Sequence, residues 1–162
     1  LGHVLMVRSL MALAGKMNHQ NYRVYTVMGD GELAEGSVWE GAMSAAHYKL
    51  DNLCAVVDRN RLQISGNTED VMHHDDLHER FRSFGWHVID VKNGNSIEEL
   101  DAAFEEAKTV KGKPTVLIAN TVKGCGSSVM ENKASWHHHV PGDEEYEQIM
   151  KDLEERKEAA LK

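Results

Sequence analysis

Two apolar runs that both end in polar residues constrain the fold of this 162-residue chain most strongly. The first run, Arg23–Met28, leads into Gly29-Asp30-Gly31, and the second, Leu53–Asp58, is followed by Asn60. Continuous apolar runs are expected of parallel strands that are covered on both faces. A helix predicted over residues 36–49 connects the runs, so the segment is expected to form a strand–helix–strand unit.

The same alternation continues along the chain and predicts one doubly wound, mostly parallel α/β sheet with helices on both faces. The helix expected over residues 4–18 is apolar on nearly every side, which is typical of a buried helix or of one without its covering layer. A polar helix is expected over 74–84. Small residues on helix 36–49 predict close packing against another helix. The other expected elements are strands Trp86–Val91 and Thr115–Asn120, a helix over 97–110 with the stripe Ile97, Leu100, Ala103, Phe104 and Ala107, and a final helix from Pro141-Gly142-Asp143 with the stripe Tyr146, Ile149, Met150 and Leu153.

The two strand ends predict a site for a divalent cation and a diphosphate at the carboxyl edge of the sheet. Asp30 supplies a hard carboxylate oxygen, and the amide oxygen of Asn60 is expected in the same crevice. Gly29 and Gly31 let the backbone approach a ligand closely, and the following helix offers free N–H groups to a phosphate. A Gly-Asp-Gly triplet alone also fits an ordinary turn; the second strand end, at Asn60, is what favours a site.

The composition narrows the classes of function. The chain has 18 basic and 26 acidic residues, and this net charge of −8 argues against partners such as nucleic acid or an anionic membrane. No apolar run approaches the length that crosses a bilayer, and no segment has the pattern of a signal peptide. Cys54, inside an apolar run, is expected to be buried, and Cys125, in a glycine loop, to be accessible. A reduced, cytoplasmic setting is expected.

The order of these motifs resembles one protein family. GDG followed by Asn at the next strand end is similar to the thiamine-diphosphate fingerprint, and GDGELAEGSVWEGAMSAAHYKLDNLCAVVDRNRLQISG resembles transketolase. The resemblance extends through FGWHVIDVKNGN, KPTVLIANTVKGCG and MENKASWH. It implies a thiamine-diphosphate-binding fold, with residues 1–162 as a single diphosphate-binding domain that is incomplete at its start. The first residues, Leu1-Gly2, fall inside the family's G-x-L-G-x-G segment, so the upstream part, the pyrimidine-binding domain and the C-terminal domain are expected to be absent.

The resemblance also implies a set of cofactor and metal residues. Asp30, Asn60 and the backbone carbonyl of Leu62 would bind Mg²⁺, with Ca²⁺ as an alternative, and diphosphate oxygens and a water would complete the coordination. His137 would lie beside the diphosphate and thiazolium and assist proton movement, a task that suits an imidazole. The implied thiamine-diphosphate-binding residues are Leu1, Gly29, Asp30, Gly31, Asn60, Leu62, Ile64, Lys123 and His137.

Several of these positions also have a plain structural interpretation. Ile64 equally fits core packing, Lys123 fits a solvated loop lysine, and Asn60 fits a residue that closes an αL turn. Glu35 and Glu40 are either helix-surface acids or, as the resemblance implies, dimer-interface acids that link two active sites.

Two runs of histidines and several departures from the family pattern also bear on the expected site. The run His137–His139 is not expected to form a metal site, because three adjacent side chains rarely converge on one ion. His73 and His74 are expected at a solvated helix start. Some residues depart from the family pattern and predict altered packing below the diphosphate and an altered loop around His137; they are Val4, Arg8, Leu10, Cys125 and His138.

The reaction implied by the resemblance is two-carbon ketol transfer between sugar phosphates, a step of the pentose phosphate pathway, with the difficult chemistry supplied by the cofactor. Activation of the cofactor needs a glutamate from a pyrimidine-binding chain or domain. The chain alone is therefore expected to be inactive, and a homodimer or heterotetramer is expected. The α subunit of a 2-oxo acid dehydrogenase and deoxyxylulose-phosphate synthase share the fingerprint, but AAHYKLDNL and Trp136-His137 favour transketolase. The alternative of another class is a non-catalytic metal–diphosphate-binding module or an interaction fragment.

Overall fold

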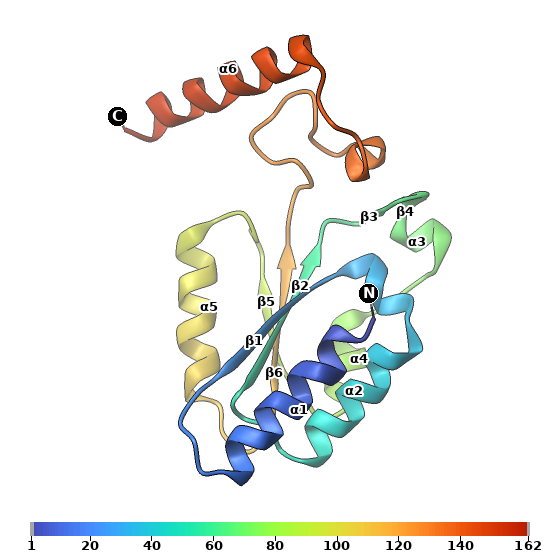
Figure 1. Ribbon diagram of the computed structural model, residues 1–162, viewed down its shortest axis with the longest axis vertical. Helices are drawn as coiled ribbons and strands as arrows, with labels where there is room; N and C mark the ends of the chain where they lie inside the picture. Colours follow the sequence, from blue (N-terminus) through green and yellow to red (C-terminus); the bar gives the residue numbers. More distant parts are fainter. Residues whose placement is uncertain (1, 162) are drawn as a thin grey trace.

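A four-stranded sheet forms the centre of the molecule in the computed structural model, which describes residues 2–161 (Figure 1). Its strands are β1 (Val24–Gly29), β2 (Leu53–Arg59), β5 (His87–Val91) and β6 (Thr115–Asn120), in the order β1-β2-β6-β5. All three pairings are parallel. The predicted parallel α/β sheet is therefore confirmed.

Helices cover both faces of this sheet, as the alternation predicted. Three of them, α1 (Val4–Met17), α2 (Gly36–His47) and α4 (Leu77–Ser83), pack on one face, and α5 (Ile97–Thr109) packs on the other. The chain travels from β1 to β2 and on to β5 through α2 and α4, and then returns to β6 through α5. Right-handed crossovers require the connecting helix to change faces when the direction of travel reverses.

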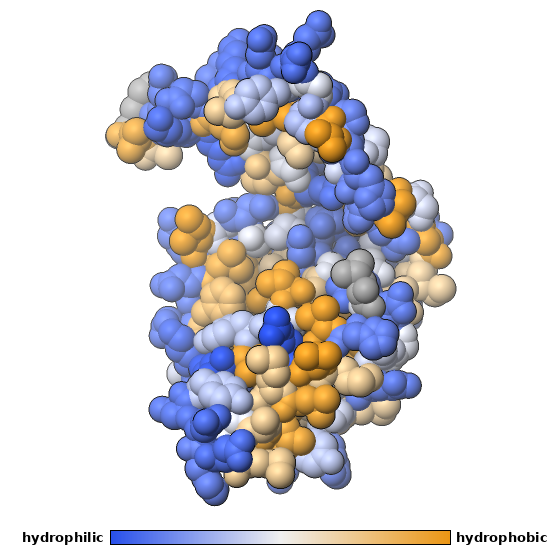
Figure 2. All heavy atoms as spheres, in the orientation of Figure 1, coloured by the Kyte–Doolittle hydropathy of each residue, from blue (hydrophilic) through white to orange (hydrophobic). Residues whose placement is uncertain are grey.

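The small residues of α2 pack against α1. A Cβ added to Gly41 would lie 3.1 Å from the backbone nitrogen of Met6, so the two helices approach more closely than a larger side chain permits. The inner side of α1 is buried, whereas Val7, Leu10 and Met11 on its outer side are exposed. Figure 2 shows apolar side chains gathered over α1 and the neighbouring β1. In this structure α1 is thus an apolar helix without a second covering layer, one of the two predicted alternatives.

Short elements gather at the carboxyl edge of the sheet, and the sequence did not predict them. They are the 3₁₀ helices η1 (Asp30–Ala34) and η2 (Ala134–His137), the two-stranded antiparallel hairpin of β3 (Leu62–Gln63) and β4 (Gly66–Asn67), and α3 (Thr68–Val71). The last helix, α6 (Asp143–Ala160), lies beyond this edge (Figure 1) and has no buried residue. Its predicted apolar stripe is therefore not part of a core in this structure.

The helix α4 differs from the polar helix expected over residues 74–84 in both its extent and its character. The side chain of Asp76 accepts hydrogen bonds from the backbone N–H groups of His78 and Glu79, so the helix begins at Leu77. Leu77 and Phe81 are fully buried, so one side of this helix belongs to the core.

Two further expectations about exposure were wrong. His74 is only 1% exposed, although a solvated position was predicted; its neighbour His73 is exposed and pairs with Glu69 and Asp75. Ile97, the first residue of the predicted α5 stripe, is 80% exposed at the start of the helix. The other stripe residues of α5 are buried or packed against the core.

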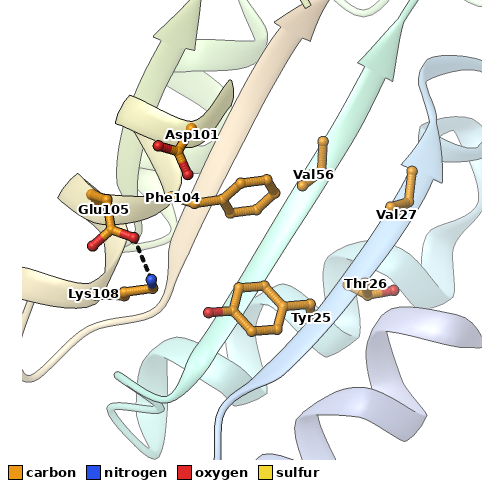
Figure 3. A pocket seen from close by; sticks show the side chains of 8 residues that line it. All are labelled: Tyr25, Thr26, Val27, Val56, Asp101, Phe104, Glu105 and Lys108. Carbon is orange, nitrogen blue, oxygen red and sulfur yellow. Dashed lines mark hydrogen bonds and ion pairs between the residues drawn. The ribbon is translucent and has the colours of Figure 1, made fainter. Parts of the chain in front are cut away.

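The strand β1 is covered on one face only, which corrects the expectation of cover on both. Its burial alternates: Thr26 is buried, whereas Tyr25 and Val27 are exposed. Beside them an open groove of about 460 Å³ separates β1 from α5, with the ring of Tyr25 edge-on to that of Phe104 at a centroid distance of 5.7 Å (Figure 3). The strands β2 and β6 are buried along nearly their whole length. Among the described helices, none combines the length and apolar character needed to cross a membrane.

Candidate functional site

The carboxylate of Asp30 forms the centre of the candidate site. Asp30 follows β1 directly and is only 2% exposed. Its Oδ1 accepts a hydrogen bond from the backbone N–H of Gly31 (2.9 Å), and its Oδ2 accepts one from the backbone N–H of Arg61 (2.7 Å). The hydroxyl of Thr68 lies 3.5 Å from the same Oδ2. Backbone from two strand ends therefore fixes the carboxylate in one orientation.

The burial of this carboxylate makes it a strong potential ligand for a cation. Burial raises the pKa of Asp30 above its usual value, and the two backbone N–H groups of Arg61 and Gly31 oppose that shift. Within residues 2–161 no lysine or arginine side chain forms an ion pair with Asp30. A buried anion without a lysine or arginine partner is stabilised when a metal ion binds.

Asn60 and Leu62 lie in the turn that touches Asp30. The side-chain Oδ1 of Asn60 accepts a hydrogen bond from the backbone N–H of Leu62 at 2.9 Å, and its Nδ2 lies 3.3 Å from Oδ1 of Asp58. Thr121 also donates to Asp58, so the turn is tied to the loop after β6. Between Asn60 and Leu62, Arg61 adopts a left-handed backbone conformation with φ of +62°. The three predicted metal ligands are thus in neighbouring segments, and all three supply oxygen, which Mg²⁺ prefers.

The glycines beside Asp30 differ in their surroundings. A Cβ on Gly31 would lie 2.9 Å from Cβ of Gln63 in β3, so the hairpin packs directly onto this glycine. The Oε1 atom of Gln63 is buried there without a hydrogen-bond partner. A Cβ on Gly29 would meet no atom within 4 Å, which leaves open space at the end of β1. An oxygen-rich donor set beside open space and an unpaired polar atom fits a metal–diphosphate group.

Among the described residues, the other predicted site residues lie around this turn. The hairpin strand β3 contacts both η1 and η2, so the segment that carries His137 lies against the segment that carries Leu62. Burial lowers the pKa of His137, and the positive charges of His138 and Lys123 lower it further, so His137 and Lys123 are electrostatic neighbours. Ile64 is 64% exposed in the tight turn of the hairpin, so the core-packing interpretation of this residue is wrong here. Leu1 lies outside the described residues.

Glu35 and Glu40 are both exposed on α2, and Glu35 occupies the position before its first turn. The helix that was expected to follow Asp30 directly is preceded by η1, so the free N–H groups of α2 begin six residues further along. Within residues 2–161 no group of three His, Cys, Asp or Glu side chains is arranged to hold a metal. The ligand set available at the turn is therefore a mixed one, with Asp30 as its charged member.

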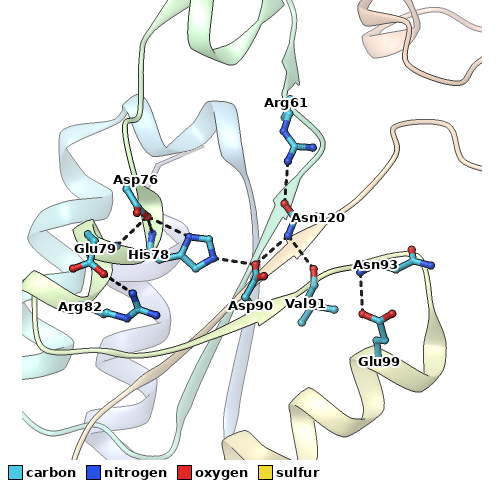
Figure 4. A network of polar contacts seen from close by, with 10 residues as sticks. All are labelled: Arg61, Asp76, His78, Glu79, Arg82, Asp90, Val91, Asn93, Glu99 and Asn120. Carbon is cyan, nitrogen blue, oxygen red and sulfur yellow. Dashed lines mark hydrogen bonds and ion pairs between the residues drawn. The ribbon is translucent and has the colours of Figure 1, made fainter.

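Residues that sequence reasoning missed form a polar chain beside the turn (Figure 4). Arg61 donates to the side chain of Asn120, which donates to Asp90, and His78 contacts the same carboxylate. Asp90 and Asn120 each stand at or next to the carboxyl end of a predicted strand, and that position was the available signal. His74 was also missed: it is buried near Asp30, and neither ring nitrogen has a partner.

The comparisons with known proteins identify the family. A family model described as "Transketolase, thiamine diphosphate binding domain" matches residues 3–159. The chain belongs to this transketolase family. Its resemblance to transketolase is thereby confirmed, and the family's enzymes are transferases.

Relatives within the family include subunits of divided transketolases. The chain is 48% identical over 156 residues to one subunit of the apulose-4-phosphate transketolase of Phocaeicola vulgatus, covering 96% of this chain and 55% of that protein. It is 40% identical over 144 residues to one subunit of the 6-deoxy-6-sulfo-D-fructose transketolase of a Clostridium species, covering 89% of this chain and 52% of that protein. The chain thus spans about half the length of these curated relatives.

Solved transketolase structures share the fold of this family member. The crystal structure of transketolase from Campylobacter jejuni superposes with a TM-score of 0.78 at 28% sequence identity. The match covers 94% of this chain and 23% of that one, so the similarity includes almost every element described above.

Proposed function

We propose that this chain is the thiamine-diphosphate- and Mg²⁺-binding part of a transketolase that transfers two-carbon ketol units between sugar phosphates. The observation that carries the proposal is the buried carboxylate of Asp30, which two backbone N–H groups orient beside the Asn60–Leu62 turn. When bound, the cofactor supplies the thiazolium carbon that takes up the two-carbon unit. The protein's own residues bind and orient that group.

The proposed division of labour follows the position of each residue. Asp30, Asn60 and the carbonyl of Leu62 hold the cation, and the cation neutralises part of the diphosphate charge. Lys123, half-buried beside His137, pairs with the diphosphate. Gly29 leaves room for the ligand, Gly31 keeps the hairpin close, and Ile64 at the tip of the hairpin contacts the cofactor.

His137 is proposed as the residue that moves a proton at the reaction centre. Partial desolvation lowers the pKa of its ring, and the positive charges of the nearby His138 and Lys123 lower it further. A lowered pKa keeps the imidazole neutral near physiological pH, and a neutral imidazole can accept a proton.

The proposed enzyme is completed by a pyrimidine-binding transketolase chain or domain, in a homodimer or a heterotetramer. Two features support a partner: the exposed apolar side of α1 and the exposed acids Glu35 and Glu40 on α2. The names of two relatives, which are both transketolase subunits, support a divided enzyme that acts on a sugar phosphate or a sulfonated sugar. Two free cysteines, one of them fully buried, favour a reducing, cytoplasmic setting.

The proposal is tested by calorimetry on the chain assembled with a pyrimidine-binding transketolase chain. We expect thiamine diphosphate to bind in Mg²⁺ but not in a chelator, and we expect Asp30→Ala to abolish the Mg²⁺-dependent binding because it removes the charged ligand. Asp70→Ala removes an exposed carboxylate in α3 and serves as the matched control. Unchanged affinity in Asp30→Ala contradicts the assignment. Binding without ketol transfer by the assembled chains supports a non-catalytic module instead.

A further inference from the structure

A continuous chain of polar contacts runs along the carboxyl edge of the sheet and ends at the proposed cation site (Figure 4). Nη2 of Arg61 donates to Oδ1 of Asn120 at 3.1 Å. Nδ2 of Asn120 donates to Oδ1 of Asp90 at 3.1 Å and to the backbone oxygen of Val91 at 3.0 Å. Nε2 of His78 lies 2.9 Å from the same Oδ1 of Asp90. The chain joins the turn after β2, the ends of β6 and β5, and the start of α4.

The residue at the end of this chain, Arg61, needs external support. It is not a glycine, yet its φ is +62°, a conformation that persists when surrounding contacts determine it. Its N–H donates to Asp30 at 2.7 Å and its carbonyl accepts from the N–H of Thr68 at 3.0 Å. Its guanidinium is exposed and is tied down by Asn120. The backbone that orients the Asp30 carboxylate therefore belongs to a residue whose side chain is anchored on β6.

The chemistry of Asn120 suits this anchoring role. A carboxamide offers an oxygen to the guanidinium and an NH₂ group to Asp90 and Val91 at the same time. A carboxylate at this position would keep the oxygen but face the negative charge of Asp90, and an ammonium would have no acceptor for Arg61. His78, held between Asp76 and Asp90, contacts the same Oδ1 of Asp90 that accepts from Asn120 and so helps to orient this carboxylate.

We propose that Asn120, oriented by Asp90, is a positioning residue for the cation site. It holds Arg61, and through Arg61 it holds the Asn60–Leu62 turn and the Asp30 carboxylate in the geometry that accepts the cation. This role rests on the proposed function of that site. Within residues 2–161, the side chains of Asp90, Asn120 and His78 form no hydrogen bond to Asp30, Asn60 or Leu62, and the proposal gives them a role through Arg61.

The first test uses hydrogen exchange in the full, ligand-free chain, so it does not depend on cofactor binding. Asn120→Ala is expected to speed amide exchange in the peptide that covers residues 60–63, because the turn loses its anchor. Arg61→Ala, at an exposed position that leaves the sheet intact, is expected to have the same effect at Leu62 and Gln63 and keeps the test decisive if Asn120→Ala does not fold. Asn93→Ala, at the same edge but outside the chain of contacts, is the control and should leave residues 60–63 unchanged. Unchanged exchange in both test variants overturns the proposal.

The second test asks whether Asn120 acts through Arg61. With thiamine diphosphate present, Mn²⁺ binding is followed by electron paramagnetic resonance in Arg61→Ala, Asn120→Ala and the double variant. Each single change should raise the apparent Kd for Mn²⁺ about five-fold, as expected for one lost net hydrogen bond. If Arg61 and Asn120 act as one unit, the double variant also raises the apparent Kd for Mn²⁺ about five-fold. Independent effects would multiply to a rise of about 25-fold and would refute the positioning role.

The two tests separate the failure of this inference from the failure of the proposed function. If the unmodified chain and Asp30→Ala bind Mn²⁺ equally, the proposed function fails, while the exchange data still decide whether Asn120 anchors the turn. If the unmodified chain binds Mn²⁺ and Asn120→Ala binds it equally well, only the positioning role is lost.

Discussion

The neighbouring strands β1 and β2 are both largely apolar in sequence, but their surroundings differ. They pair in parallel, in register from Val24 opposite Leu53 to Gly29 opposite Asp58, and both lead into the candidate site. The first five residues of β2 are buried, whereas burial alternates along β1. Opposite Val27, which is 66% exposed, β2 has Val56 at 9% exposure, and the next residue of β2, Val57, is fully buried. The apolar sequence of a strand indicates the surroundings that suit it. For β1, those surroundings would include side chains packed over Tyr25 and Val27, which are exposed in this structure.

The polar ends of the two strands do not share this difference. Hydrogen bonds orient the side chains of both Asp30 after β1 and Asn60 after β2. Asp30 accepts from the backbone N–H groups of Gly31 and Arg61, and Asn60 accepts from that of Leu62. The candidate site is held by backbone contacts between the strand ends, and the missing cover lies on the side of β1 that faces α5. The site and the open face can therefore be tested independently.

The largest expected difference between the strands is in the cost of removing a valine side chain. Val57→Ala should lower the free energy of unfolding by about 2–3 kcal/mol, because two buried carbons are lost and a cavity remains. Val27→Ala should change it by no more than about 0.5 kcal/mol, as is usual for exposed positions. Urea denaturation of both variants measures the two values. Equal losses would show that β1 is covered in solution, by self-association or otherwise.

Periodicity predicted the main elements of this fold well because their apolar faces are long. The strand Thr115–Asn120 has the predicted bounds, and α5 ends one residue before the predicted end. The hairpin of β3 and β4 was missed because strands of two residues carry no periodic pattern. The burial of His74 was missed for a related reason: it lies between elements, where no pattern indicates which side chains turn inward.

The candidate site was predictable only where strand ends reveal it. Asp30 and Asn60 follow consecutive strands that pair directly, so the convergence of their segments follows from the sequence and the parallel topology. The contacts among Arg61, Asn120 and Asp90 also require β6 to lie between β2 and β5, and strand order is not visible in one sequence. The positive φ of Arg61 had no signal either, because only glycine and asparagine adopt that conformation readily.

A second comparison concerns Cys54, whose side chain is buried in β2 opposite Tyr25 of β1. Burial raises the pKa of the Cys54 thiol from 9.0 to about 11, and the nearby Arg23 opposes the shift only in part. The unfolded chain therefore ionises this thiol first, so the stabilising contribution is complete below pH 9 and is lost as the pH rises toward 11.

Between pH 9 and 11, ionisation of Cys54 is expected to lower the free energy of unfolding by on the order of 2 kcal/mol, and we expect Cys54→Ala to remove this loss. The measurement is the free energy of unfolding of both chains at several pH values, and Cys125→Ala is the control because Cys125 is partly exposed in a loop. Parallel pH curves for the unmodified chain and Cys54→Ala would show that water reaches this side of β2.

The smallest expected effect concerns the open face itself. Apolar dyes bind to contiguous exposed apolar surface, and Tyr25 and Val27 line such a surface beside α5 (Figure 3). Val27→Lys should reduce the fluorescence of bound anilinonaphthalene sulfonate while leaving the free energy of unfolding within about 0.5 kcal/mol, because the substituted side chain already faces solvent. Val71→Lys places the same charge at an exposed valine of α3, away from β1, and should leave the fluorescence unchanged. An equal decrease in both variants would mean that added charge, not loss of the β1 surface, weakens dye binding. No decrease in Val27→Lys would mean that this face is already covered in solution, and β1 would then be surrounded in the way that its sequence, like that of β2, predicts.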